Sequence, residues 1–337
     1  MSGRFDRQTR FGPLGPEGQE RIERARVLVV GCGALGGVLA GSLARAGVGE
    51  LALVDRDLVD ETNLHRQVLF DERHAREGWA KVDAAADTLA RIGGPTRVET
   101  FATHLDASNV RELARGADLV LDGTDNLATR YLVNDLCVRE SIPWIYGGVV
   151  GGGGLAMAVL PGHGACLRCL FPEPPPAGTL ETCETAGVIG PAVGAIASVQ
   201  AGLALHVLAR PGELAPRIVE IDAWSGVARS LPAPRAKDCP ACVRGEFPFL
   251  DRAVAREAEV LCGRAAVQVR GRGALPDLAR LERTLVGVAR DVRRAGPLLR
   301  FAVEGERMTL FADGRAIVEG TEDPSRALLL YDRYVGT

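Results

Sequence analysis

Short apolar runs alternate with longer amphipathic stretches through the first half of the chain. Residues 26–30 and 50–55 are predicted to form buried strands, and between them residues 38–46 place apolar side chains on one helical face. The alternation continues with expected helices at 81–92, 109–115 and 130–140 and expected strands at 97–102, 118–122 and 143–147. Strands that alternate with helices predict an α/β fold with a Rossmann-like, doubly wound sheet.

The pattern changes in the second half. Residues 149–160 begin with glycines and become apolar, and 217–222 and 228–231 read as a strand pair joined by a turn at 224–226. Residues 170–182 contain four prolines and are expected to form a loop, while 194–208 are expected to form a long apolar helix. These strands predict that the sheet is mixed.

Beyond residue 245 the chain becomes rich in Arg and Glu. Strands are expected at 265–269, 298–303, 307–311 and 316–319, and helices at 275–285 and 325–334. The expected organisation is a large domain over 1–245 followed by a small α+β domain of unknown role over 246–337.

Composition narrows the function classes. The 337 residues are 47% hydrophobic with a net charge of −3, which gives no argument for nucleic acid as a partner. No apolar run reaches the roughly 18 residues of a membrane span, and the N-terminus lacks the apolar core of a signal peptide. We therefore expect a cytoplasmic protein with no membrane partner.

A glycine-rich turn follows the first predicted strand. Gly31, Gly33 and Gly36 would let the backbone approach a phosphate at a helix N-terminus. Asp55 ends the next strand, where a carboxylate can accept hydrogen bonds from a ribose. An NAD(P)-dependent oxidoreductase would show the same pattern, and so would a tight turn without a ligand.

Polar residues that follow the predicted strands distinguish a phosphate-reacting site from an NAD(P) site and from a turn without a ligand. Asn63, Arg66, Lys81 and Asp125 lie in or beside strand-end loops, which meet at one crevice of an open α/β sheet. Cations can neutralise charge on a reacting phosphate, and a carboxylate can hold Mg²⁺. Hydride transfer has no use for such a cluster, so a reacting phosphate with Mg²⁺ is favoured over NAD(P).

Two Cys-x-x-Cys pairs stand far apart in the chain. Four thiolates with this spacing are typical of a closed structural Zn²⁺ site, and the four residues are Cys166, Cys169, Cys239 and Cys242. A redox pair is the alternative, but neither pair opens a helix after a strand. Cys32, Cys137 and Cys262 lie in apolar settings and are expected to be buried small hydrophobic residues.

Cys183 follows the proline-rich loop and is a candidate nucleophile. Glu181 and Glu184 flank it, and their charges would raise the pKa of its thiol. Its role is left open between a catalytic cysteine and an inert one.

Several segments together resemble the ThiF/MoeB/HesA family, the bacterial relatives of ubiquitin-activating enzymes. The segments are Arg-Phe-Asp-Arg-Gln at 4–8, the glycine loop, Leu-Val-Asp-Arg-Asp-Leu-Val at 53–59, Asn-Leu-His-Arg-Gln at 63–67 and Asp-Gly-Thr-Asp-Asn at 122–126. The resemblance covers about 1–245 and extends to some longer ThiF-type proteins through the tail. It implies ATP-dependent adenylation of the C-terminal Gly-Gly carboxylate of a sulfur-carrier protein in thiamine or molybdopterin biosynthesis.

The resemblance also implies roles for single residues. Asp55 would hold the ribose, Asp125 would bind Mg²⁺, and Arg7 would reach into the site of a second subunit in a homodimer. The remaining nucleotide contacts would come from the following residues: Gly31, Gly33, Ala34, Gly36, Asp57, Asn63, Arg66, Gln67, Lys81 and Asn126. Both cysteine pairs would bind zinc, and Cys183 would join the carrier or relay sulfur from a cysteine desulfurase or another donor.

Two alternatives to the adenylating enzyme remain. One is an NAD(P)-dependent oxidoreductase, which rests only on the glycine loop and Asp55. The other is a zinc-stapled scaffold without catalysis, which the presence of Arg66, Lys81 and Asp125 disfavours. The carrier and its pathway are left open.

Overall fold

The computed structural model describes residues 3–174, 186–251, 258–261, 265–270 and 276–335. The chain forms two compact units, Met1–Ala253 and Val254–Thr337. The division follows Ala253, whereas the sequence analysis placed a boundary after residue 245. Cys183 and Cys262 lie outside the described residues.

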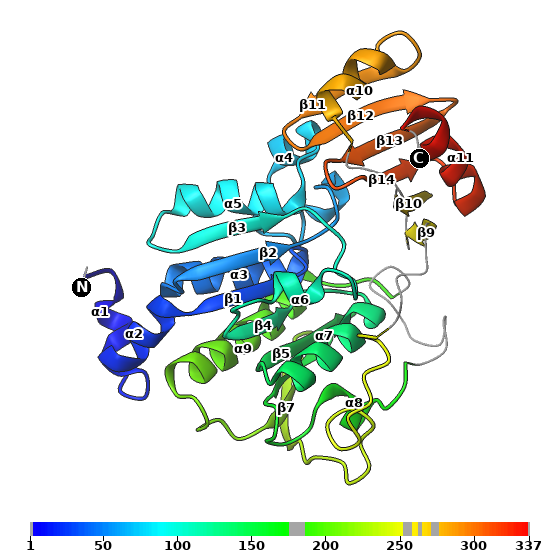
Figure 1. Ribbon diagram of the computed structural model, residues 1–337. Coiled ribbons are helices and arrows are strands. Elements are labelled where there is room, and N and C mark those ends of the chain that lie inside the picture. The colour runs from blue at the N-terminus through cyan, green and yellow to red at the C-terminus, as the bar shows by residue number, and fades with distance from the viewer. Residues whose placement is uncertain (1–2, 175–185, 252–257, 262–264, 271–275, 336–337) are drawn as a thin grey trace. The chain divides into compact units, whose positions relative to one another are not determined.

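The first unit is built on a mixed eight-stranded sheet with the order β3-β2-β1-β4-β5-β6-β7-β8 (Figure 1). Its parallel half contains β1 (Arg26–Val30), β2 (Glu50–Val54), β3 (Arg97–Phe101), β4 (Leu119–Asp122) and β5 (Trp144–Val150). Its antiparallel half adds β6 (Gly153–Val159), β7 (Arg217–Asp222) and β8 (Val227–Pro232). The predicted doubly wound α/β fold with a mixed sheet is confirmed.

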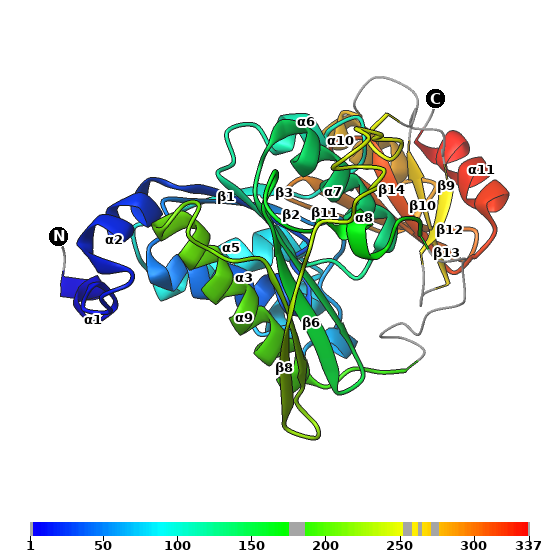
Figure 2. The same ribbon diagram turned by 90° about the horizontal axis from the view of Figure 1, so that it is seen from below.

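Helices cover both faces of this sheet. On one face, α3 (Ala34–Ala46) packs along α9 (Gly190–Ala209), and α5 (Lys81–Ile92) packs against α3 and β3 (Figure 2). On the other face, α6 (Val110–Leu113) and α7 (Leu127–Glu140) close a core with β1, β2 and β4. By length and composition α9 could cross a membrane, but it packs against α2, α3 and β5–β7 and is a core helix of this unit.

Several short helices were not predicted. They are the 3-10 helices η1 (Gly3–Phe5) and η2 (Glu61–Asn63) and the α-helices α1 (Asp6–Thr9), α2 (Gly15–Arg24), α4 (Glu72–Glu77) and α8 (Leu167–Leu170). The N-terminal helices lie at the C-terminal end of α3, because Gln8 and Gln19 both donate hydrogen bonds to the carbonyl oxygen of Ala46.

The arrangement of β1 and its neighbours prepares a ligand site. The chain proceeds from β1 to β2 on one side, and β4 lies on the other side of β1. In open α/β sheets, ligands bind beyond the carboxyl ends of the strands at the point where the strand order reverses. Four of the five residues of β1 and of β2 are buried, so polar groups that follow these strands are held by a rigid core.

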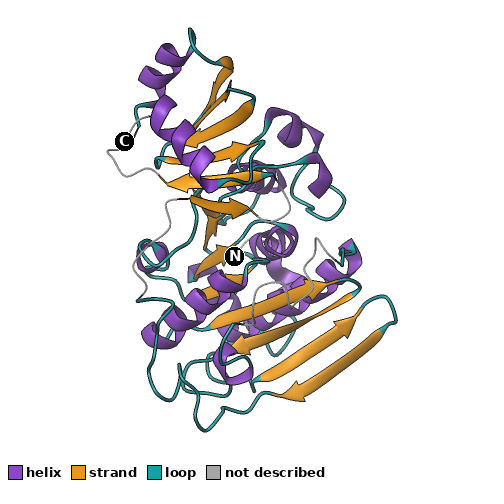
Figure 3. Ribbon diagram, turned by 90° about the vertical axis from the view of Figure 1, so that its right-hand side faces the viewer, coloured by secondary structure: helices purple, strands orange, loops and turns teal. Residues whose placement is uncertain are grey.

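The second unit contains a six-stranded antiparallel sheet with the order β11-β12-β13-β14-β10-β9 (Figure 3). Its strands are β9 (Ala258–Leu261), β10 (Ala266–Arg270), β11 (Arg290–Ala295), β12 (Leu298–Val303), β13 (Glu306–Phe311) and β14 (Arg315–Glu319). The helices α10 (Leu278–Leu285) and α11 (Pro324–Tyr334) contribute to one core with Leu299, Phe301 and Val318 and therefore cover the same face. Strands β9 and β11 were not predicted.

Candidate active site

The glycine loop between β1 and α3 is shaped by direct backbone contacts. Gly31 has a φ of +88°, and a Cβ there would lie 2.7 Å from the carbonyl oxygen of Gly123 in the loop after β4. A Cβ on Gly36 would overlap the carbonyl oxygen of Gly31. Around Gly33, by contrast, the nearest atom is Nε2 of Gln67 at 3.7 Å. Gly31 and Gly36 thus allow close packing, and Gly33 leaves the first turn of α3, which begins at Ala34, open to a phosphate.

Two carboxylates lie directly after β2. Asp55 accepts hydrogen bonds from the backbone amides of Cys32, at 2.6 Å, and Asp57, at 2.7 Å, so it connects the glycine loop to its own strand end. Burial raises the pKa of Asp55, and the nearby ammonium of Lys81 opposes this rise. A carboxylate has about four acceptor positions, so Asp55 can still accept hydrogen bonds from a ribose.

Lys81 begins α5 and is buried at the same place. Its Nζ lies 2.8 Å from Oδ2 of Asp57, and its backbone amide donates to the carbonyl oxygen of Asp57. Burial alone would lower the pKa of Lys81, but the charges of Asp57, Asp55 and Asp125 outweigh it and raise the pKa. The ammonium is therefore charged at neutral pH and available to a phosphate.

Buried amide groups border this cluster. Asn63 and Gln67 are almost inaccessible to solvent, and Oδ1 of Asn63 and Oε1 of Gln67 have no hydrogen-bond partner among the described residues. A buried polar atom without a partner is destabilising, and a bound ligand relieves the cost. Arg66 lies between them in sequence and is half-buried, and its guanidinium donates to the carbonyl oxygen of Thr62. These contacts fit a polar, phosphate-bearing ligand such as ATP.

Asp125 is the exposed carboxylate of the loop after β4. A buried ion pair holds this loop, because Arg130 Nε lies 2.8 Å from Oδ2 of Asp122 and the same guanidinium donates to the carbonyl oxygens of Thr124 and Gly147. Asp122 also accepts hydrogen bonds from the amide and hydroxyl of Thr124. An exposed carboxylate on a fixed loop suits Mg²⁺, which is bound by few protein ligands and keeps several waters.

Sequence reasoning did not select Asp122 or Arg130 as site residues. The signal that could have found them is the spacing between a strand-end acid and an arginine on the first turns of the following helix. Asn126, which was expected to contact the nucleotide, accepts a hydrogen bond from the amide of Thr129 and caps α7. Its other polar atom remains available to a ligand.

Arg7 does not join the cluster of its own chain. It is exposed on α1, next to Gln8, which is bound to the C-terminal end of α3. The glycine loop lies at the opposite end of this helix, and α3 has 13 residues, so the two ends are about 20 Å apart.

The four paired cysteines form a separate cluster in the antiparallel half. Their sulfur atoms all lie within 4.8 Å of one another, and the distances between Cys166 and Cys239 and between Cys169 and Cys242 are both 3.5 Å. A tetrahedral Zn²⁺ with Zn–S bonds of about 2.3 Å requires sulfurs roughly 3.8 Å apart. Burial and the neighbouring thiols raise the pKa of Cys166, so a bound cation would relieve the repulsion between thiolates.

An open groove of about 750 Å³ lies at the end of the antiparallel strands. It is lined by residues 151–155, 186–189 and 220–222 and by Trp224, whose side chain is 82% exposed. The lining segment at 186–189 continues to Gly190, which lies against the backbone of His65 and Arg66. The groove and the polar cluster are therefore connected by a short stretch of chain.

Comparisons with known proteins identify the family of the chain. The model of the ThiF family matches residues 5–241. The chain is 38% identical, over the full length of both proteins, to the sulfur carrier protein ThiS adenylyltransferase of Bacillus subtilis. It is 40% identical to a sulfur carrier protein adenylyltransferase of Thermus thermophilus, a match that covers 77% of this chain and 96% of that protein.

The fold is also that of a solved structure. The crystal structure of Escherichia coli MccB with ATP superposes with a TM-score of 0.61 at 22% identity and covers 72% of this chain and 75% of that one. None of these relatives is described as an oxidoreductase. The predicted family is confirmed, and the chain belongs to the ThiF family.

Proposed function

We propose that this chain is an adenylyltransferase that uses ATP and Mg²⁺ to activate the C-terminal carboxylate of a ubiquitin-like sulfur carrier ending in Gly-Gly. The observation that carries the proposal is the buried Lys81 beside Asp55 and Asp57, at the open end of the glycine loop. The full-length relative described as a ThiS adenylyltransferase supports the same activity.

The residues of the site can support this reaction without a general base. The carrier carboxylate is ionised near pH 7, so its oxygen attacks the α-phosphorus directly, the bond to the bridging oxygen breaks, and pyrophosphate leaves. Gly33 and the N-terminus of α3, with Lys81 and Arg66, would neutralise charge on the phosphates. Asp125 would hold Mg²⁺, which supplies further neutralisation of the polyphosphate.

The groove beside Trp224 is the proposed route for the carrier. Its glycine-lined floor leaves room for an extended Gly-Gly tail, and Val188 and Ile189 offer apolar contacts. The segment at 187–190 leads from the groove to Arg66, so a tail in the groove would point its carboxylate toward the phosphates.

Zn²⁺ is proposed as the ligand of Cys166, Cys169, Cys239 and Cys242, with a structural role. The two pairs belong to distant segments, and a metal between them would join the region after β6 to the end of the first unit. A closed set of four thiolates leaves no position for a substrate.

A homodimer is proposed from Arg7. The residue lies at the wrong end of α3 to serve its own chain, so a second chain would receive it. We further propose that the protein is located in the cytoplasm. We propose that Cys183 takes part in sulfur transfer and that the sulfur comes from a separate donor, such as a cysteine desulfurase. We also propose that the second unit, Val254–Thr337, acts as a distinct domain.

Pyrophosphate exchange tests the activity. The full chain, Mg²⁺-ATP, a ThiS- or MoaD-like carrier and labelled pyrophosphate should regenerate labelled ATP only when the carrier has its terminal glycine. Absence of exchange with any such carrier would contradict the proposal.

A further inference from the structure

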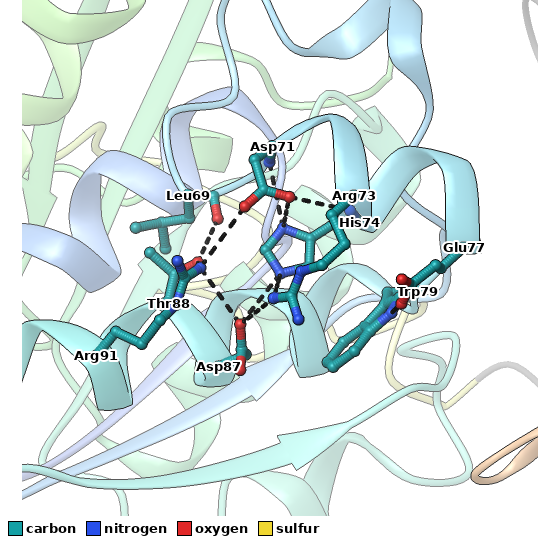
Figure 4. A network of polar contacts seen from close by, with 9 residues as sticks. All are labelled: Leu69, Asp71, Arg73, His74, Glu77, Trp79, Asp87, Thr88 and Arg91. Carbon is teal, nitrogen blue, oxygen red and sulfur yellow. Dashed lines mark hydrogen bonds and ion pairs between the residues drawn. The ribbon is translucent and has the colours of Figure 1, made fainter.

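The segment that leads from Phe70 to Lys81 is held by a compact polar network (Figure 4). At its centre is His74, on α4, whose side chain is fully buried. A buried imidazole is stable only when both ring nitrogens have partners, and here both partners come from elements that frame Lys81.

The first nitrogen completes a helix cap. Asp71 accepts a hydrogen bond from the amide of His74 at 3.0 Å, and the amide of Asp71 donates to Nδ1 of His74 at 3.2 Å. This reciprocal pair is a capping box in which histidine occupies the position usually held by Glu or Gln. Nδ1 can accept this hydrogen bond when the ring carries its proton on Nε2.

The second nitrogen reaches the helix that carries Lys81. Nε2 of His74 lies 3.3 Å from Oδ2 of Asp87 on α5 and donates to it. Burial opposes ionisation of Asp87, but hydrogen bonds from His74 and Arg73 outweigh it and lower the pKa of this carboxyl. Asp87 therefore remains an acceptor at neutral pH, and it joins α4 to α5.

The backbone continues this connection to the active site. The carbonyl oxygen of His74 accepts a hydrogen bond from the backbone amide of Trp79. The carbonyl oxygen of Trp79 in turn accepts a hydrogen bond of 2.8 Å from the backbone amide of Val59. Ala80 then forms a bridge with Leu58, and Lys81 follows at the start of α5. The guanidinium carbon of Arg73 lies over the Trp79 ring, 5.2 Å from its centroid, and so packs on the turn between α4 and α5.

We propose that His74 and Asp87 are positioning residues that fix Lys81 in the nucleotide site. The segment at 71–81 is held to α5 by the His74–Asp87 hydrogen bond and to the loop after β2 by the bridge between Ala80 and Leu58. Without the first connection, the buried link between α4 and α5 is lost. The turn before Lys81 is then supported on that side only by the exposed ion pairs of Arg73 with Asp87 and of Arg91 with Asp71. The inference rests on the proposed role of Lys81 in binding ATP.

Two conservative variants of His74 distinguish the roles of its two ring nitrogens. In His74→Asn, the side-chain oxygen can still accept the amide of Asp71, as Nδ1 does, but the side chain is too short to reach Asp87. In His74→Gln, the amide nitrogen extends to the position of Nε2 and can donate to Asp87. We expect H74N to raise the Kd for Mg²⁺-ATP about tenfold, and H74Q to restore most of the affinity.

A double-mutant cycle distinguishes positioning from general stability. The Kd for Mg²⁺-ATP is measured by titration calorimetry on the full chain for wild type, H74N, Lys81→Ala and the double variant. If His74 acts through Lys81, H74N should have less than a twofold effect in the K81A background. Val110→Ala, which thins the core at α6, is the control: it should lower the melting temperature with an unchanged Kd.

The outcomes are separable. Wild-type affinity in H74N, or the same tenfold loss with and without Lys81, would overturn the positioning role while leaving the proposed activity intact. A wild-type chain that does not bind Mg²⁺-ATP would overturn both.

Discussion

The parallel and antiparallel halves of the first unit place their polar and apolar groups differently. In the parallel half, strands such as β1 are covered on both faces, and the polar groups gather at the strand ends. In the antiparallel half, every residue of β8 is exposed, and Trp224 and Leu231 present apolar surface to solvent. A small charged ligand needs groups fixed within fractions of an ångström, whereas a protein partner needs an open surface with apolar anchors.

The largest effect is expected from replacing the exposed carboxylate of the parallel half, Asp125. Asp125→Ala should reduce carrier-dependent pyrophosphate exchange by about 10²–10³-fold, because it removes the proposed ligand of a Mg²⁺ ion that would act on the developing charge. The fold should be unaffected, since the side chain is exposed. Glu213→Ala, which removes another exposed carboxylate, is the matched control, and equal activities of the two variants would contradict the assignment.

Removal of the proposed zinc should destabilise the antiparallel half and leave the nucleotide site intact. Cys239→Ser or treatment with a strong chelator should lower the melting temperature by roughly 10 °C or more, because a structural metal contributes several kcal/mol. Below this transition, the Kd for Mg²⁺-ATP should stay within about twofold of wild type. Metal analysis should find about one zinc per chain. Cys137→Ala is the control, as this buried cysteine stands outside the cluster.

Substitution in the groove should separate the two ligands. Trp224→Ala should weaken binding of a ThiS- or MoaD-like carrier about tenfold, since exposed aromatic anchors dominate protein interfaces, and it should leave ATP binding unchanged. Isothermal titration with each ligand measures both effects. Val243→Ala removes apolar surface elsewhere on the same unit and should have no effect on the carrier. A change in ATP affinity for W224A would mean that the halves are not separable.

The smallest effect concerns Asp135, a buried carboxyl on α7 that faces Phe249 and Arg168. Burial raises the pKa of Asp135 to about 6, despite a hydrogen bond from the amide of Phe249 and the nearby Arg168. Because this folded-state pKa exceeds the unfolded value of about 4, the stabilising contribution is complete below pH 4 and is lost as the pH rises through 6.

We therefore expect the free energy of unfolding of wild type, relative to Asp135→Asn, to fall by about 1 kcal/mol between pH 4.5 and 7. The full shift would correspond to roughly 3 kcal/mol, but Arg168 can move toward the charged form and reduce it. Denaturant melts of both proteins across this range measure the difference. A constant difference would show that Asp135 is ionised throughout.

Much of the fold followed from the hydrophobic pattern. The strand Arg26–Val30 and the helix Lys81–Ile92 were predicted at their observed bounds, because buried strands and amphipathic helices leave clear periodicities. The strand β11, with the sequence Arg-Asp-Val-Arg-Arg-Ala, was missed because it is an edge strand with exposed charges and a register shift against β12. Strand β11 forms because it pairs with β12, and the hydrophobic periodicity of β11 alone does not predict that pairing.

The site was predictable to a similar degree. Lys81 and Asp55 could be grouped because strand-end loops of a parallel sheet converge, whatever the side chains do. The Asp122–Arg130 pair and the His74–Asp87 pair could not, because each depends on how helices pack against a strand or another helix. The position of a loop at a strand end can be predicted from sequence. The side-chain contacts that hold the loop in place depend on tertiary packing and cannot be predicted in this way.

The contact between Gly31, Gly36 and Gly123 has a consequence for how such an enzyme can diverge. Three backbone positions from two distant segments tolerate no side chain, so the loop that meets the phosphates and the loop that carries Asp125 have no freedom to vary separately. Changes in carrier preference are therefore expected on the exposed strands and the groove, away from these two loops. The glycine trio couples the position of the glycine loop to that of the loop with Asp125, so a substitution at any of the three glycines should displace both loops together.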